Sequence, residues 1–294
     1  MIAPVATAGL AFATSLAVTP LVRRLAHLCG ATDVPDARRV HTQVTARAGG
    51  VGVLFAAALA LALGGGLPAL LGPSVLAGAA LLLVIGLIDD IVSLRAQTKL
   101  LGQVIAAGLA VYGGLRFQLF GAGATGPLAA LDAVATGTWV VLITNAFNLT
   151  DGLDGLASGI ATFSFLALAA VGLQAHDPTL VAVALVLAGA LLGFLPYNFN
   201  PASIFLGDTG SLVLGYALAV LPLVGTKGQP LPLEDVVSDG GGGTVHSESL
   251  ANSRSLPEWG GHVLMRLTVI AAGVLIFPLA WAYVRFKQGI PPGV

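Results

Sequence analysis

The stretch that decides the fold runs from residue 73 to residue 90 and reads PSVLAGAALLLVIGLIDD. It carries no charged residue from 73 to 88, and Asp89 and Asp90 follow directly. A hydrocarbon core roughly 30 Å thick needs about 20 predominantly apolar residues per helix. The stretch therefore predicts a membrane span that ends in two acids at the polar interface.

The rest of the chain repeats this pattern. Further apolar stretches lie at about 2–22, 50–67, 100–115, 129–147, 158–175, 179–195, 211–225 and 263–284, and they contain only two charged residues, Asp132 and Arg266. The chain is 56% hydrophobic and only 9% charged, with a mean hydropathy of +0.92, whereas a soluble domain carries about 25% charged residues. This composition excludes a soluble fold. It predicts an all-α polytopic membrane protein with about nine transmembrane helices, forming a single membrane domain over residues 1–294.

The distribution of basic residues predicts the orientation. The loop between the first two predicted spans holds five arginines, namely Arg23, Arg24, Arg38, Arg39 and Arg47. Basic residues are retained in cytoplasmic loops, so the amino terminus is expected outside and the carboxyl terminus in the cytoplasm. Alternation then makes the loops 23–49, 89–99, 148–158 and 196–210 cytoplasmic. The glycine-rich segment 227–261 becomes a flexible external linker.

Polar residues at the span ends converge on the predicted cytoplasmic face. They are Asp89, Asp90, Asn145, Asn148, Asp151, Asp154 and Asp208. An unpaired charge near hydrocarbon costs a few kcal/mol even on lenient insertion scales. Residues 145, 148 and 151 are spaced by three, so they share one face if the helix continues. The alternative is a helix end capped by turn residues.

A second motif surrounds Asp208. Residues 205–211 read FLGDTGS, which places glycines around an aspartate directly before an apolar helix. Backbone N–H groups at a helix start form an anion site, and Mg²⁺ prefers one or two carboxylates together with phosphate oxygens. The alternative is an ordinary capped helix start. Lys99 lies at the start of the next predicted span after Asp90, where it is either an anion-binding group or only a topological charge.

Four pieces in order along the chain carry a family resemblance. They are DVPDARRVH at 33–41 with Gly49 and Gly50, GLIDD at 86–90 with Lys99, NAFNLTDGLDG at 145–155, and NFNPA at 198–202 leading into GDTGS at 207–211. Together they resemble the polyprenyl-phosphate N-acetylhexosamine-1-phosphate transferases, glycosyltransferase family 4, over roughly residues 20–225. The first piece is more similar to the undecaprenyl-phosphate GlcNAc-1-phosphate transferases than to the phospho-MurNAc-pentapeptide translocases.

The resemblance implies a reaction and a set of site residues. Undecaprenyl phosphate would attack the β-phosphate of a UDP-N-acetylhexosamine, most simply UDP-GlcNAc, and release UMP, with Mg²⁺ as cofactor and Mn²⁺ as the alternative. The implied catalytic residues are Asp89, Asp90 and Asp208; the implied metal ligands are Asn148 and Asp208; and the implied substrate-binding residues are Lys99, Asn145, Asp151, Asp154, Phe205, Gly207, Arg39 and His41.

The resemblance also implies a cellular setting. The active site would face the cytoplasm at a bacterial plasma membrane, and its product would initiate a cell-envelope glycan. The expected partners are undecaprenyl phosphate, the UDP-sugar and membrane lipid, with a homodimer left open. A formal net charge of −1 lacks the basic surface of a nucleic-acid-binding protein, so no nucleic acid is expected.

One departure from the family leaves alternatives open. Family members carry a histidine-rich cytoplasmic loop after the ninth span, and no histidine cluster follows residue 284 here. A truncated, non-catalytic relative that binds the lipid carrier or a partner is therefore a second hypothesis. A transporter is a third, because polar groups in spans can mark an ion path, but here they gather at one interface.

Overall fold

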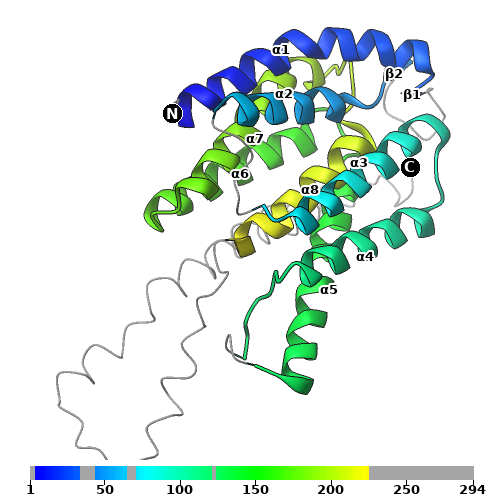
Figure 1. Ribbon diagram of the computed structural model, residues 1–294. Coiled ribbons are helices and arrows are strands. Elements are labelled where there is room, and N and C mark those ends of the chain that lie inside the picture. Colours follow the sequence, from blue (N-terminus) through cyan, green and yellow to red (C-terminus); the bar gives the residue numbers. More distant parts are fainter. Residues whose placement is uncertain (1–3, 34–43, 65–70, 121–123, 225–294) are drawn as a thin grey trace, which may run out of the picture.

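The computed structural model describes residues 4–33, 44–64, 71–120 and 124–224 (Figure 1). This part of the chain forms eight helices and one hairpin of two-residue strands. In order they are α1 (Pro4–Cys29), β1 (Thr32–Asp33), β2 (Thr45–Ala46), α2 (Gly49–Gly64), α3 (Pro73–Val92), α4 (Ala96–Tyr112), α5 (Gly126–Thr150), α6 (Leu156–Gln174), α7 (Pro178–Asn198) and α8 (Gly207–Val224).

Each predicted span before residue 225 coincides with one of these helices. Six of the described helices, α1, α3, α5, α6, α7 and α8, are long and apolar enough to cross a membrane. Helix α2 is apolar but shorter, with 16 residues. The chain is thus an all-helical polytopic membrane protein. The predicted ninth span, 263–284, and the linker 227–261 lie outside the described residues, and the orientation stays a prediction.

Two loops are shorter than predicted because the helices before them continue past their apolar stretches. Helix α1 continues to Cys29 and stops before Gly30, whose φ of +74° is the left-handed conformation that commonly ends a helix. Helix α3 continues to Val92 and ends at Ser93, which has a φ of +57°. The predicted cytoplasmic segments 23–49 and 89–99 therefore each begin inside a helix. Asp89 and Asp90 lie on the last turn of α3, where helical geometry holds their side chains.

Helix α8 forms the centre of the molecule. It lies between a group formed by α1, α2, α6 and α7 and a second group formed by α3, α4 and α5 (Figure 1). Exposed large hydrophobic side chains occur on every other described helix but not on α8. In a membrane these exposed side chains contact lipid, so α8 is the helix that the others shield from it.

Small residues bring some helices into close contact. Gly189 and Gly193 of α7 face the backbone of α1, and a Cβ added to them would lie 2.4 Å from the carbonyl oxygen of Ala8 and 2.3 Å from that of Phe12, respectively. Such small-xxx-small spacing allows membrane helices to approach closely. The packing of α1 on α7 therefore depends on the absence of side chains at these two positions.

A short backbone ladder joins the start of α2 to the start of α8. Strand β2 pairs antiparallel with β1, and Ala46 also forms a parallel bridge with Ile204. The amide of Phe205 donates to the carbonyl of Ala46 at 2.8 Å, and the amide of Gly49 donates to the carbonyl of Phe205 at 2.9 Å. This ladder holds residues 45–50 beside residues 204–207.

Candidate active site

The first turn of α8 is where three helices meet. A Cβ added to Gly86 of α3 would lie 2.6 Å from the carbonyl oxygen of Asp208, and one added to Gly50 of α2 would lie 2.2 Å from the Cα of Gly210. Gly207 has a φ of +75°, which favours glycine. These glycines allow α2 and α3 to come within backbone contact of the residues around Asp208.

Asp90 holds this first turn in place. Its Oδ1 accepts a hydrogen bond from the amide of Asp208 at 2.8 Å, and its Oδ2 accepts from the amide of Thr209 at 3.0 Å and from the hydroxyl of Thr209 at 2.6 Å. The first N–H groups of a helix have no partner within that helix. Asp90 of α3 therefore acts as a helix cap for α8, supplied by a different helix.

Asp89 faces a different set of partners. Its Oδ1 accepts from the amide of Leu94 at 2.6 Å, and its Oδ2 lies 3.3 Å from the Nζ of Lys99. The same ammonium group also donates to Oδ2 of Asp208 at 2.5 Å. Lys99, in the first turn of α4, thus bridges the carboxylates of α3 and α8. The two adjacent aspartates do different things, as their separation of about 100° around a helix requires.

Arg47 is a second cation at this point, and the sequence analysis did not identify it as a site residue. Its Nε lies 3.8 Å from Oδ1 of Asp90, and its Nη2 lies 3.9 Å from Oδ1 of Asp208. In the sequence it was one of five loop arginines that indicated only topology. The backbone ladder between β2 and residues 204–206 brings it to the site, and no local pattern reports that pairing.

Asp151, just after α5, lies close enough to this cluster for its negative charges to affect the pKa of the Asp151 carboxyl. Burial raises the pKa of its carboxyl to about 7, with a further upward contribution from the charges of Asp208 and Asp90. The guanidinium of Arg47 and a hydrogen bond from the amide of Gly207 oppose this shift. Four carboxyl groups therefore share the site with two cations.

The donor atoms fit a divalent cation. One carboxylate oxygen from each of Asp89, Asp90 and Asp208 lies within 4.8 Å of the others, and all three residues are buried. Asn148 donates its Nδ2 to the Oγ of Ser211 at 2.8 Å, and its side-chain oxygen accepts no hydrogen bond from the described residues. Carboxylate and amide oxygens are the ligands that Mg²⁺ and Mn²⁺ prefer. Because Asp90 caps α8, Asp89, Asp208 and Asn148 are the better candidates.

The other predicted residues lie around this cluster or outside the described chain. Asp154 accepts from the Nδ2 of Asn200 at 3.0 Å and the amide of Ala202 at 2.9 Å, which ties the α5–α6 connection to the α7–α8 connection. Phe205 belongs to the backbone ladder, and Asn145 lies partly buried one turn before Asn148. Arg39 and His41 lie outside the described residues.

Comparison with known proteins identifies the family. The profile of glycosyl transferase family 4 matches residues 73–226, more than half of the chain. A phospho-N-acetylmuramoyl-pentapeptide-transferase from Desulforudis audaxviator is 38% identical over 269 residues, which cover 76% of this chain and 77% of that protein. The chain belongs to glycosyl transferase family 4. The predicted resemblance is confirmed.

Other relatives in glycosyl transferase family 4 carry names from its N-acetylglucosamine branch. A probable undecaprenyl-phosphate N-acetylglucosaminyl 1-phosphate transferase from Bacillus subtilis is 37% identical over 215 residues, which cover 72% of this chain and 60% of that protein. A decaprenyl-phosphate N-acetylglucosaminephosphotransferase from Mycolicibacterium smegmatis is 40% identical over 224 residues, which cover 68% of this chain and 54% of that protein. The chain therefore spans only part of the length of these two relatives.

Proposed function

We propose that this protein transfers N-acetylhexosamine-1-phosphate, with GlcNAc-1-phosphate as the first candidate, from a UDP-sugar to a polyprenyl phosphate. The observation that carries the proposal is the bridge that Lys99 makes between Asp89 and Asp208 at the start of α8. A cation between two carboxylates at the end of apolar helices suits a charged diphosphate that meets a lipid at the membrane surface. The names of the relatives support the same choice.

The proposed reaction is a phosphoryl transfer. An oxygen of the lipid phosphate forms a bond to the β-phosphorus of the UDP-sugar, the bond from that phosphorus to the bridging oxygen breaks, and UMP leaves with the electron pair. A phosphate monoester has a second pKa near 6, so the acceptor is mostly dianionic at neutral pH and needs little help from a general base. Catalysis then depends on positioning and charge neutralisation.

The residues of the chain supply most of that positioning. Lys99 would neutralise the donor diphosphate while it stays paired with Asp208, and Asp90 would keep the first turn of α8 in register. Asp89, Asp208 and Asn148 would hold Mg²⁺, with Mn²⁺ as the alternative. When bound, the metal supplies Lewis-acid stabilisation of charge on the phosphate oxygens.

The proposal places the reaction at the cytoplasmic face of a bacterial plasma membrane, in the initiation of a cell-envelope glycan. The lipid acceptor reaches the site from the bilayer and the nucleotide reaches it from water. The residues of the cluster come from the ends of α3 and α5, from the starts of α4 and α8, and, for Arg47, from the connection between β2 and α2. A site at helix ends is accessible to both phases, whereas a site in mid-bilayer would exclude the nucleotide.

The experiment is release of UMP from UDP-GlcNAc by purified protein with undecaprenyl phosphate, with and without Mg²⁺. We expect Mg²⁺-dependent release that is lost in Asp208→Asn. The matched control is Asp177→Asn, because Asp177 caps the start of α7 by accepting from the amide of Leu180, and asparagine caps a helix about as well. No release from folded wild-type protein that binds the nucleotide would contradict the proposal.

A further inference from the structure

We propose that Arg47 binds the phosphate group of the polyprenyl acceptor. Lys99 then binds the donor diphosphate, so that each cation binds one of the two substrates. This inference rests on the proposed function and adds a residue to it. The two cations contact different oxygens of one carboxylate: the Nζ of Lys99 contacts Oδ2 of Asp208, and the Nη2 of Arg47 lies 3.9 Å from Oδ1.

The backbone around Arg47 is fixed. Its amide donates to the carbonyl of Ala31 at 2.8 Å, and the preceding residue, Ala46, is bonded to Phe205 in the ladder. The following residue, Ala48, has a φ of +67° and is 5% exposed. A non-glycine residue in this conformation is strained, and such strain gathers at functional sites. The fold thus holds the side chain of residue 47 beside the start of α8.

The guanidinium itself is not fully used by the protein. Its contacts to Asp90 and Asp208, at 3.8 and 3.9 Å, are longer than the 2.7–3.2 Å typical of N–H···O hydrogen bonds. Within the described part of the chain the guanidinium makes no hydrogen bond, and 24% of the side chain is exposed. A guanidinium presents five donors in a planar fork that matches a phosphate. These donors are available to a ligand that comes from the open side.

The geometry of the reaction assigns that ligand to the acceptor. In phosphoryl transfer the attacking and leaving oxygens lie roughly in line, on opposite sides of the phosphorus. If Lys99 holds the donor diphosphate beside one oxygen of Asp208, the cation beside the other oxygen is left for the second anionic group of the reaction, the acceptor phosphate. The acceptor is a dianion that must enter a site rich in carboxylates. A positive group with free donors removes that repulsion.

A purely structural role for Arg47 predicts a different outcome. If it only neutralised Asp90 and Asp208, its loss would disturb the first turn of α8 and weaken donor and acceptor binding together. If it binds the acceptor phosphate, its loss weakens acceptor binding selectively. The two roles therefore differ in a measurable ratio of affinities.

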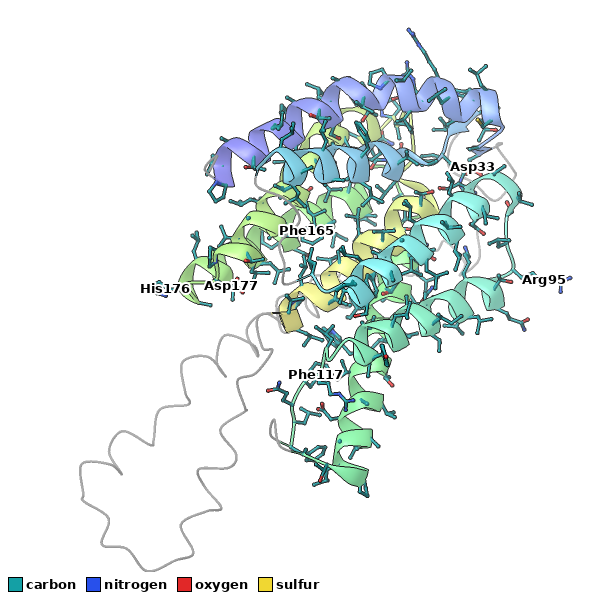
Figure 2. All side chains as sticks on the ribbon, in the orientation of Figure 1. Asp33, Arg95, Phe117, Phe165, His176 and Asp177 are labelled. Atoms are coloured by element: carbon teal, nitrogen blue, oxygen red, sulfur yellow. The ribbon has the colours of Figure 1, made fainter. Side chains whose placement is uncertain are left out.

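The test compares Arg47→Gln, Arg47→Lys and Arg95→Gln in purified, detergent-solubilised full chain. Arg95 is a matched control because it is exposed just before α4 and its side chain points away from the bundle (Figure 2). Each variant is titrated with undecaprenyl phosphate in detergent micelles and, separately, with UDP-GlcNAc and Mg²⁺. Steady-state KM values for both substrates and thermal unfolding complete the comparison.

We expect Arg47→Gln to weaken acceptor binding about 10- to 100-fold, as the loss of a charge-assisted hydrogen bond implies, with unchanged affinity for UDP-GlcNAc. Arg47→Lys keeps the charge but not the fork, so it should recover part of the loss, and Arg95→Gln should match the wild type. Equal weakening of both ligands, or unchanged acceptor affinity, would overturn the inference. If Arg47→Gln does not fold, the test uses Arg47→Lys: selective loss of acceptor affinity relative to donor affinity supports the inference, and equal loss of both overturns it. Wild-type protein that binds neither substrate would refute the proposed function itself.

Discussion

We expect replacement of Asp90 to lower the free energy of unfolding, because Asp90 caps α8, and not only to affect the reaction. Asp90→Ala removes the acceptor of three hydrogen bonds from Asp208 and Thr209. Thr209 is fully buried and Asp208 nearly so, so water cannot easily replace the lost acceptor. The start of α8 would then have two buried amides without a partner.

The expected cost follows from these contacts. A buried donor left without an acceptor costs about 1–3 kcal/mol, so two amides place Asp90→Ala at about 2–6 kcal/mol of unfolding free energy. Asp90→Asn keeps one acceptor oxygen and should cost about 1–3 kcal/mol. Thr209→Val removes only the hydroxyl bond and should cost about 1–2 kcal/mol. The predicted order of destabilisation is therefore alanine at 90, asparagine at 90, then valine at 209.

The assay is unfolding of the purified variants in mixed detergent micelles, with thermal unfolding as a second measurement. The matched control is Asp89→Asn, because its remaining oxygen still accepts from the amide of Leu94. That variant should stay close to wild type in stability and lose activity. If Asp90→Ala unfolds within about 0.5 kcal/mol of the wild type, Asp90 does not cap α8 and the reasoning is wrong.

Two further predictions concern charge and packing. The pKa of Asp151 is raised to about 7 in the folded protein, so the folded metal-free protein keeps a proton on Asp151 that the unfolded chain loses at lower pH. The stability of the protein should therefore fall by up to about 1.4 kcal/mol per pH unit as the pH rises towards 7. Asp151→Asn should lack this part of the slope in thermal unfolding at constant ionic strength, and parallel slopes would contradict the assignment. Gly50→Ala should cost about 1–3 kcal/mol or more, because its Cβ would lie 2.2 Å from Gly210. Gly108→Ala, where nothing lies within 4 Å, is the control that should be no less stable than the wild type, and an equal loss of stability in both variants would exclude close packing as the cause.

Six apolar helices long enough to span a membrane, and the meeting of three acidic residues, could be predicted from local patterns. An apolar stretch such as 73–88 has to form a helix in hydrocarbon, because only a helix satisfies its backbone hydrogen bonds within one segment. The acids that follow it cannot lie deep in the membrane without a partner. Asp89, Asp90 and Asp208 were therefore expected at one interface, and the structure brings them together.

The helix ends were less predictable. Composition marks where the hydrocarbon ends, but a helix continues until its backbone meets a stop such as the left-handed Gly30 or Ser93. For this reason α1 and α3 extend past their apolar stretches, and the loops that follow them are shorter than predicted.

The division of labour within the site required the tertiary structure. Asp90 and Thr209 are 119 positions apart in the chain, and their contact depends on how closely α3 and α8 approach at Gly86. Arg47 reaches Asp208 only because β2 pairs with the segment before α8. Hydropathy and motif spacing report what a residue does within its own helix or turn, so they placed these groups at one membrane face. Which aspartate caps α8, and which arginine joins the cluster, follows from contacts between distant segments that no local pattern contains.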